Sequence, residues 1–209
     1  MKSIRITAAA LAIMLALLAF ASCTPGKPET TTVAVTTEAE TTEAVTTEAV
    51  TTEAETTAAD TAEETAQDGR LVFEGISIEL PAGFTTTESV TSGQKVITAV
   101  PPEYPAKSDN ITLTSGVDKV DNYTKESLQL MYDQIFGAGA VTDLTVTRDK
   151  FGDLDRVIIT YNVTVNGSAM KQKSCNYFSG DKVVVITFTD VTGSYVSEFD
   201  AAYESIQKA

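Results

Sequence analysis

Residues 156 to 175 contain the pattern that most restricts how this chain can fold. Every second residue from 157 to 165 is apolar and most residues between them are polar, which is typical of a β-strand with one buried face. Asn166-Gly167 follows at once and supplies the two positive φ angles of a type I′ turn, so a second strand returns from Ser168. The predicted cross-strand pairs are Val165 with Ser168, Tyr161 with Gln172, and Ile158 with Cys175.

The remaining patterns predict more strands and two helices. Thr124 is a good N-cap for a helix whose core face carries Leu128, Met131 and Ile135, and Gly137 is a good stop signal. The other predicted elements are a hairpin over 71–80, strands over 94–100 and 110–116, a hairpin turn over 148–156, an interior strand over 183–188, and an amphipathic helix over 194–207. Because strands and helices do not alternate, we expect an α+β fold with a mainly antiparallel sheet.

Two short patterns support a family resemblance over residues 70 to 209. The first is Ile78-x-Leu80-Pro81-x-Gly83-Phe84, and the second is Tyr195-x-x-x-Phe199-x-x-x-Tyr203-x-x-Ile206 in the last helix. With the middle helix and the long hairpin, they resemble the PsbP/Mog1-like domains, which bacterial lipoproteins also carry. The resemblance implies an antiparallel sheet sandwiched between helices (an αβα sandwich) and a non-catalytic role in binding or assembly. It assigns no functional residue.

The N-terminus has the features of a lipoprotein signal peptide over residues 1–22. Lys2 and Arg5 precede an apolar segment over 13–20, which is shorter than the ~20 residues of a membrane-spanning helix. Phe20-Ala21-Ser22-Cys23 is similar to the bacterial lipobox, although Phe20 stands where Leu is usual. We therefore expect acyl chains such as palmitate on Cys23, which would anchor the protein to the outer face of the cell membrane. The alternative is an ordinary signal peptide cut nearby, with Cys23 as a free thiol.

Residues 23–69 form a low-complexity segment built from a five-residue Thr-Thr-Glu-Ala-Glu/Val repeat. A segment so poor in large apolar side chains buries too little surface to offset its ordering entropy, so we expect a disordered linker spanning roughly 40 Å. It holds eleven acidic residues and one lysine, while the globular domain expected over 70–209 holds eighteen acidic and twelve basic residues. This negative charge excludes nucleic acid as a partner, because phosphate would be repelled.

The residues that could carry catalysis are few. The sequence contains no histidine, which excludes Ser-His-Asp and Cys-His sites and His-rich zinc sites. Cys175 is expected to be a buried strand residue, although Lys171 and Lys173 on its face could lower its pKa. Asp149, Asp153 and Asp155 lie in one turn, where basic neighbours favour a solvated hairpin over a cation site. We expect neither a metal nor a cofactor.

Three hypotheses about function follow. The first is a membrane-anchored, non-enzymatic lipoprotein whose domain binds a protein or cell-envelope partner. The second is a binding module for a small apolar or peptide ligand, held between the sheet and the loop over 101–109. In either case the candidate binding residues are Pro102, Tyr104 and Pro105 of this proline-rich loop. The third hypothesis is a hydrolase that uses carboxylates or Cys175.

Overall fold

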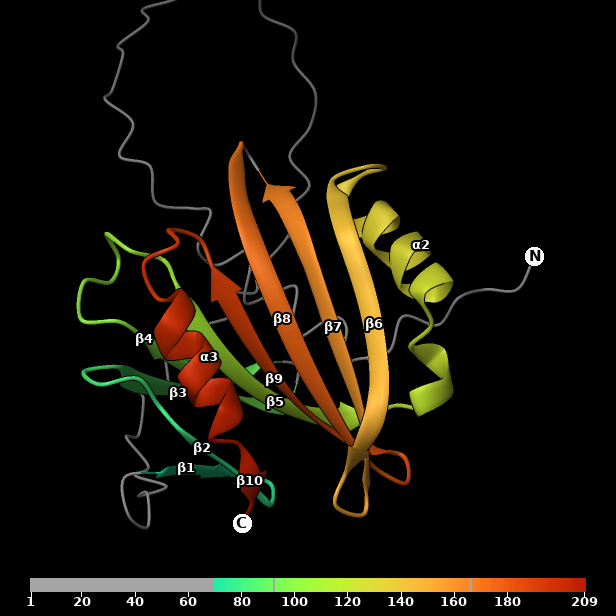
Figure 1. The fold of residues 1–209 in the computed structure, drawn as a ribbon, viewed down its shortest axis with the longest axis horizontal. Helices are drawn as coiled ribbons and strands as arrows, with labels where there is room; N and C mark the ends of the chain where they lie inside the picture. The colour runs from blue at the N-terminus through green and yellow to red at the C-terminus, as the bar shows by residue number, and fades with distance from the viewer. Residues whose placement is uncertain (1–69, 92, 166) are drawn as a thin grey trace, which may run out of the picture.

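The computed structural model describes residues 70–91, 93–165 and 167–209 of the chain. Figure 1 shows these residues as a strongly curved sheet with a smaller sheet below it and two α-helices beside it. The strands are β1 Arg70–Phe73, β2 Ile76–Glu79, β3 Thr85–Thr91, β4 Gln94–Val100, β5 Asn110–Val117, β6 Val141–Phe151, β7 Leu154–Val165, β8 Ser168–Ser179, β9 Lys182–Asp190 and β10 Gln207–Lys208. The helices are the short 3-10 helix η2 Val120–Asn122, α2 Lys125–Phe136 and α3 Val196–Glu204.

The large sheet has seven strands in the order β3-β4-β5-β9-β8-β7-β6, and its pairs are antiparallel. The small sheet has the order β1-β2-β10 and is also antiparallel. The predicted α+β class with a mainly antiparallel sheet and two flanking helices is confirmed.

The pairing of β7 with β8 has the register that the sequence predicts. Val165 lies opposite Ser168, Tyr161 opposite Gln172 and Ile158 opposite Cys175. Asn166, the first residue of the predicted turn, lies outside the described residues, and Gly167 has the expected positive φ of 81°. The predicted interior strand is β9, which lies between β5 and β8.

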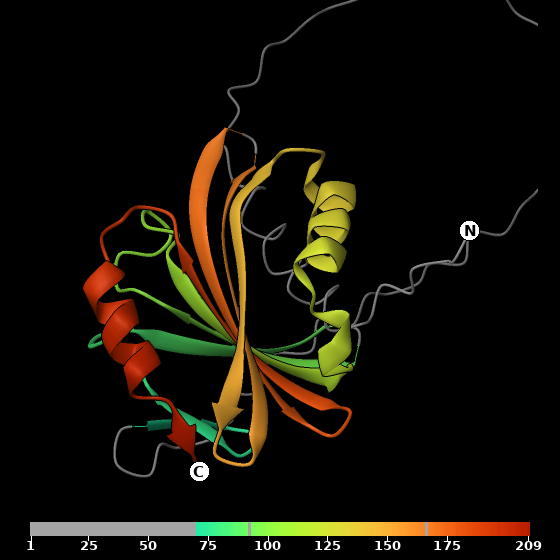
Figure 2. The ribbon, with the colours of Figure 1, turned by 45° about the vertical axis from the view of Figure 1, so that its right-hand side comes forward.

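The two helices cover opposite faces of the large sheet (Figure 2). On one face, α3 and the small sheet bury an apolar cluster that includes Ile78, Ile111, Ile186 and Phe199. On the other face, α2 packs on the half of the sheet formed by β6 and β7, with Leu128 and Tyr132 buried. Thr124 caps α2 as predicted, since its hydroxyl accepts a hydrogen bond from the Ser127 N–H at 3.1 Å.

Three features differ from the sequence prediction. Strand β3 was not predicted, because its sequence TTTESVT lacks apolar alternation and most of its residues are exposed. The predicted hairpin over 71–80 exists, but it forms a separate sheet with β10. The last helix covers 196–204, which is shorter than the predicted 194–207, because Gln207 leaves it to pair with Ser77 of β2.

The predicted signal peptide, the lipidated Cys23 and the predicted linker all lie outside the described residues. None of the helices within 70–91, 93–165 and 167–209 is long and apolar enough to cross a membrane.

Candidate functional site

The loop that joins β4 to β5 carries the three predicted binding residues. Pro102, Tyr104 and Pro105 are all exposed, with 40% of the Tyr104 surface accessible. The loop has a compact backbone, because the Tyr104 N–H donates to the Pro101 carbonyl at 3.0 Å and the Lys107 N–H donates to the Glu103 carbonyl at 3.2 Å. The Tyr104–Pro105 peptide bond is cis. The structure therefore brings the three predicted residues onto one ordered and solvent-facing loop.

Asp109 fastens the end of this loop to the segment between β9 and α3. Its carboxylate is fully buried and accepts hydrogen bonds from the Val191 N–H at 2.9 Å, the Thr192 N–H at 3.1 Å and the Thr192 hydroxyl at 2.7 Å. Burial acts to raise the pKa of Asp109, but these hydrogen bonds outweigh it, so its pKa lies below the usual range. The neighbouring Asp190 has a raised pKa, caused first by burial and also by the Asp109 carboxylate.

A second tie joins the middle of the loop to the start of α3. The Tyr195 hydroxyl donates to Glu103 Oε2 at 2.6 Å, and Lys107 Nζ lies 3.2 Å from Glu103 Oε1. Lys107 Nζ also lies 5.2 Å from the centre of the Tyr195 ring. The hydrogen bond from Tyr195 lowers the pKa of Glu103, and the same bond raises the pKa of Tyr195 to about 12. The loop is thus tied to the start of α3 through Tyr195, which bonds to Glu103 and whose ring lies under the Lys107 ammonium group.

A cluster of aromatic rings packs around Tyr195, the residue that ties the loop to α3. The Phe84 ring centre lies 5.2 Å from that of Tyr195 and 6.1 Å from that of Phe199, both edge-on. Phe84 ends a turn that contacts the loop, since a Cβ placed on Gly83 would lie 3.0 Å from Pro102 Cγ. Val196, at the start of α3, is 48% exposed. We call the surface formed by Pro102, Tyr104 and Pro105 the loop surface.

Cys175 has the surroundings of a core residue. It is fully buried between Ile158 of β7 and Ile186 of β9. Burial raises the pKa of its thiol to about 12, although Lys173 acts in the opposite direction. Lys173 itself lies over the Tyr203 ring, with Nζ 3.8 Å from the ring centre. The thiol is therefore protonated at neutral pH, whereas a nucleophile must be a thiolate.

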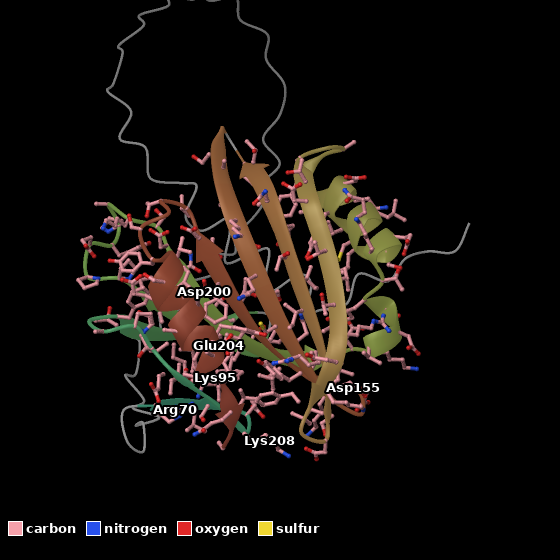
Figure 3. The ribbon with its side chains drawn as sticks, viewed as in Figure 1. Arg70, Lys95, Asp155, Asp200, Glu204 and Lys208 are labelled. Carbon is pink, nitrogen blue, oxygen red and sulfur yellow. The ribbon has the colours of Figure 1, made fainter. Side chains whose placement is uncertain are left out.

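Each of the three carboxylates of the β6–β7 turn forms an ion pair with a different basic side chain. Asp149 accepts two hydrogen bonds from Arg156, at 2.8 and 2.6 Å, and this pairing lowers its pKa. Asp155 pairs with Lys150 at 2.7 Å, and Asp153 pairs with Lys208 of β10. Figure 3 shows Asp155 at the turn and Lys208 near the chain end. Within the described ranges no cluster of three or more Asp, Glu, Cys or His side chains could hold a metal ion.

Sequence reasoning missed a row of buried polar side chains on the sheet face that carries α2. The Tyr161 hydroxyl donates to Gln172 Oε1, and Gln172 Nε2 donates to Thr189 Oγ1 at 3.1 Å. Beside them, the Thr187 hydroxyl donates to Ser174 Oγ at 3.3 Å. The signal for this row was the run of polar residues at the even positions 172, 174 and 176, which share one face of β8.

Two atoms of this face are buried without a hydrogen-bond partner in the described part of the chain, Asn176 Oδ1 and Thr114 Oγ1. Tyr161 and Tyr132 pack there with ring centres 4.6 Å apart, and burial raises the pKa of both hydroxyls. Buried polar networks of this kind specify register, because a shifted strand would leave more such groups unpaired. We therefore attribute the row to the fold.

Comparison with known proteins extends only to the fold. No model of a protein family matches the sequence, and no curated protein matches it. Among solved structures, one from Bacteroides thetaiotaomicron has 13% identity and a TM-score of 0.41. The similarity covers 68% of this chain and 48% of that protein, so the chain spans about half of its length. LpqN, described as involved in cell envelope biogenesis of Mycobacterium tuberculosis, has 15% identity and a TM-score of 0.38, with 63% of this chain and 82% of that chain covered.

The solution structure of cyanobacterial PsbP (CyanoP) from Synechocystis has 12% identity and a TM-score of 0.51. The similarity covers 67% of this chain and 91% of CyanoP. At such low identity the similarity concerns architecture and carries no function across. The chain therefore has a PsbP-like α+β fold, in agreement with the resemblance that its sequence showed.

Proposed function

We propose that this protein is a lipid-anchored, extracytoplasmic binding protein without catalytic activity, and that its loop surface contacts a protein or cell-envelope partner. The observation that carries the proposal is the presentation of Tyr104, which is 40% exposed between two exposed prolines on a loop held by hydrogen bonds at its middle and at its end. An aromatic side chain on a pre-ordered loop loses little conformational entropy on binding, and aromatic residues dominate the energetics of protein interfaces.

The ties around the loop support this proposal. Asp109 fixes its end to Thr192, and Glu103 fixes its middle to Tyr195, so a partner that binds Tyr104 also reaches the start of α3. Val196 adds exposed apolar area there. The anchoring part of the proposal comes from the sequence Phe20-Ala21-Ser22-Cys23 and from the acidic linker that follows it.

Site-specific photo-crosslinking tests the loop surface. A photoreactive phenylalanine analogue at position 104 of the full-length protein, expressed in its source cell, should crosslink to one dominant partner. The matched control is position 130, because Leu130 is 48% exposed but lies on α2, against the opposite face of the sheet. Equal crosslinking at both positions, or none at 104, would contradict the proposal.

The same experiment separates the second hypothesis from the first. A small apolar or peptide ligand bound behind the loop would contact Phe84 and Tyr195, whose ring centres lie 5.2 Å apart, and the Tyr195 hydroxyl bonds to Glu103 of the loop. Such a ligand would raise the melting temperature of the protein and would give no protein adduct at position 104. The hydrolase hypothesis loses Cys175 as a candidate nucleophile, because burial raises the pKa of its thiol to about 12, and it then depends on carboxylates alone.

A further inference from the structure

The large sheet has two edge strands, β3 and β6, and they differ in how well they could accept another strand. The pairing of β6 with β7 is interrupted between Thr142 and Thr145, and β6 carries Arg148, Asp149 and Lys150 near its end. Bulges and charged side chains of this kind discourage pairing at a sheet edge. By contrast, β3 pairs with β4 without interruption from Thr85 to Thr91 and contains one charged residue, Glu88.

The outer edge of β3 is exposed. Most of its side chains are exposed, and Val90 is 71% exposed, more than the other large hydrophobic side chains that are exposed in the described residues. Glu88 already has a partner, since Lys95 Nζ of β4 lies 3.0 Å from its Oε2; Figure 3 marks Lys95. In an antiparallel pair, alternate N–H and C=O groups point away from the partner strand, so no strand within 70–91, 93–165 and 167–209 occupies the outer hydrogen-bonding positions of β3.

The sequence of β3 recurs in the N-terminal repeats. Residues 86–91 read TTESVT, and residues 41–46 and 46–51 both read TTEAVT, identical at five of six positions. Because this sequence forms a strand in β3, its close copies have side chains compatible with the same backbone conformation. Thr and Val favour strands, whereas Ala and Glu do not, so the repeats need an existing edge on which to pair.

We propose that the outer edge of β3 is a docking surface for a β-strand, and that its occupant is a Thr-Thr-Glu-Ala-Val repeat from residues 41–51 of the same chain. Antiparallel pairing centred on the shared sequence places Glu88 opposite Ala44 and Glu43 opposite Ser89. Parallel pairing in register would place Glu43 directly opposite Glu88, and like charges at that position repel. The docked strand is therefore antiparallel to β3.

The length of the chain between the repeats and the described part allows this contact. Nineteen residues separate Val50 from Arg70, and a chain of this length spans roughly 25 Å. A compact unit of 140 residues has a radius of gyration of about 14 Å. β1, which begins at Arg70, and β3 lie at the same end of the molecule in both views (Figures 1 and 2). Tethering at this distance gives an effective concentration on the order of millimolar, which supports a weak contact.

Hydrogen exchange on the full mature protein in detergent tests the proposal at single amides. With only residues 92 and 93 between the paired Thr91 and Gln94, alternation directs the N–H groups of Thr86, Glu88 and Val90 away from β4. In the wild type these three amides should exchange at least tenfold more slowly than in an Ala44→Pro/Ala49→Pro variant, because Ala44 and Ala49 lie opposite Glu88 in the two copies and proline there removes the N–H that faces β3. Exchange at Thr87 and Ser89, which bond to β4, should be equal in both proteins.

The matched control is Ala34→Pro/Ala58→Pro, which adds two prolines outside the two TTEAVT copies and should retain the slow exchange. Adding a synthetic peptide of residues 41–51 at millimolar concentration to the Ala44→Pro/Ala49→Pro variant should restore it. Equal exchange in all three proteins would overturn the proposal. Slow exchange that depends on protein concentration and accompanies a doubled mass would also overturn it, because the strand would then come from a second copy.

Discussion

At the scale of single residues, Asp109 decides how the candidate loop is held. Its buried carboxylate joins the start of β5 to Val191 and Thr192, more than eighty positions later in the chain. No local pattern marks Asp109 for this role, since its partners are brought near it only by the pairing of β5 with β9. The exposed positions of Pro102, Tyr104 and Pro105 are different, because a proline-rich segment between two strands is already expected at the surface.

We predict that Asp109→Asn lowers the free energy of unfolding by about 1–3 kcal/mol at pH 7, because the amide cannot accept all three hydrogen bonds and leaves a buried donor unpaired. Urea unfolding of the two proteins measures this difference. Asp121→Asn is the control, since Asp121 is exposed, and should change stability by less than about 0.5 kcal/mol.

The effect of Asp109→Asn should depend on pH with a defined sign. The pKa of Asp109 is lower in the folded protein than in the unfolded chain, where it is about 3.9. The stabilisation by its carboxylate is therefore complete above that value and is lost as the pH falls through the folded pKa. A difference between the two proteins that stayed constant down to the lowest accessible pH would contradict this assignment.

At the scale of elements, the turn before β3 shows how a backbone requirement and a contact combine at one position. Gly83 has a φ of +81°, and a Cβ there would lie 3.0 Å from Pro102 Cγ. Gly75, in the turn between β1 and β2, has nearly the same φ of +82° but no atom within 4 Å of such a Cβ. The two glycines therefore separate the cost of the backbone conformation from the cost of the contact.

We predict that Gly75→Ala destabilises the protein by about 1 kcal/mol, the cost of a positive φ for a residue with a Cβ. Gly83→Ala should cost about 1 kcal/mol more, because the added methyl group presses on Pro102. It should also reduce crosslinking at position 104, which Gly75→Ala should leave unchanged. Thermal or urea unfolding with the crosslinking assay measures both, and equal effects of the two variants would show that the turn does not position the loop.

The elements also show what local patterns predict well. Strict alternation and an Asn-Gly turn predict the β7–β8 register, because a slip by one residue would move every apolar side chain to the wrong face. Strand β3 escaped prediction because an exposed edge strand needs no apolar alternation, and its backbone is held by pairing with β4. The end of α3 was placed too late, because the pairing of Gln207 with Ser77 is a contact between distant parts of the chain.

At the scale of the whole molecule, the proposed function requires attachment to a membrane through Cys23. We predict that Cys23→Ala moves the protein from the membrane fraction to the soluble fraction, because the acyl chains proposed on Cys23 are its anchor. Fractionation followed by immunoblotting measures this. A Cys175→Ala variant is the control and should stay with the membranes, since Cys175 is buried in the sheet. An unchanged distribution of Cys23→Ala would refute the anchor.

The sequence by itself determined the fold class, the main strand pairing, the surface position of the proline-rich loop and the core faces of both helices, except for the buried Tyr132 of α2. These depend on local periodicity and turn chemistry, which act over a few neighbouring residues. Only the tertiary structure decided that Asp109 and Glu103 fasten this loop to the start of α3, and that β3 is an edge of the large sheet among the described residues. Those properties depend on burial and on hydrogen bonds between residues far apart in the chain, which are set only when the sheet closes around its two apolar clusters.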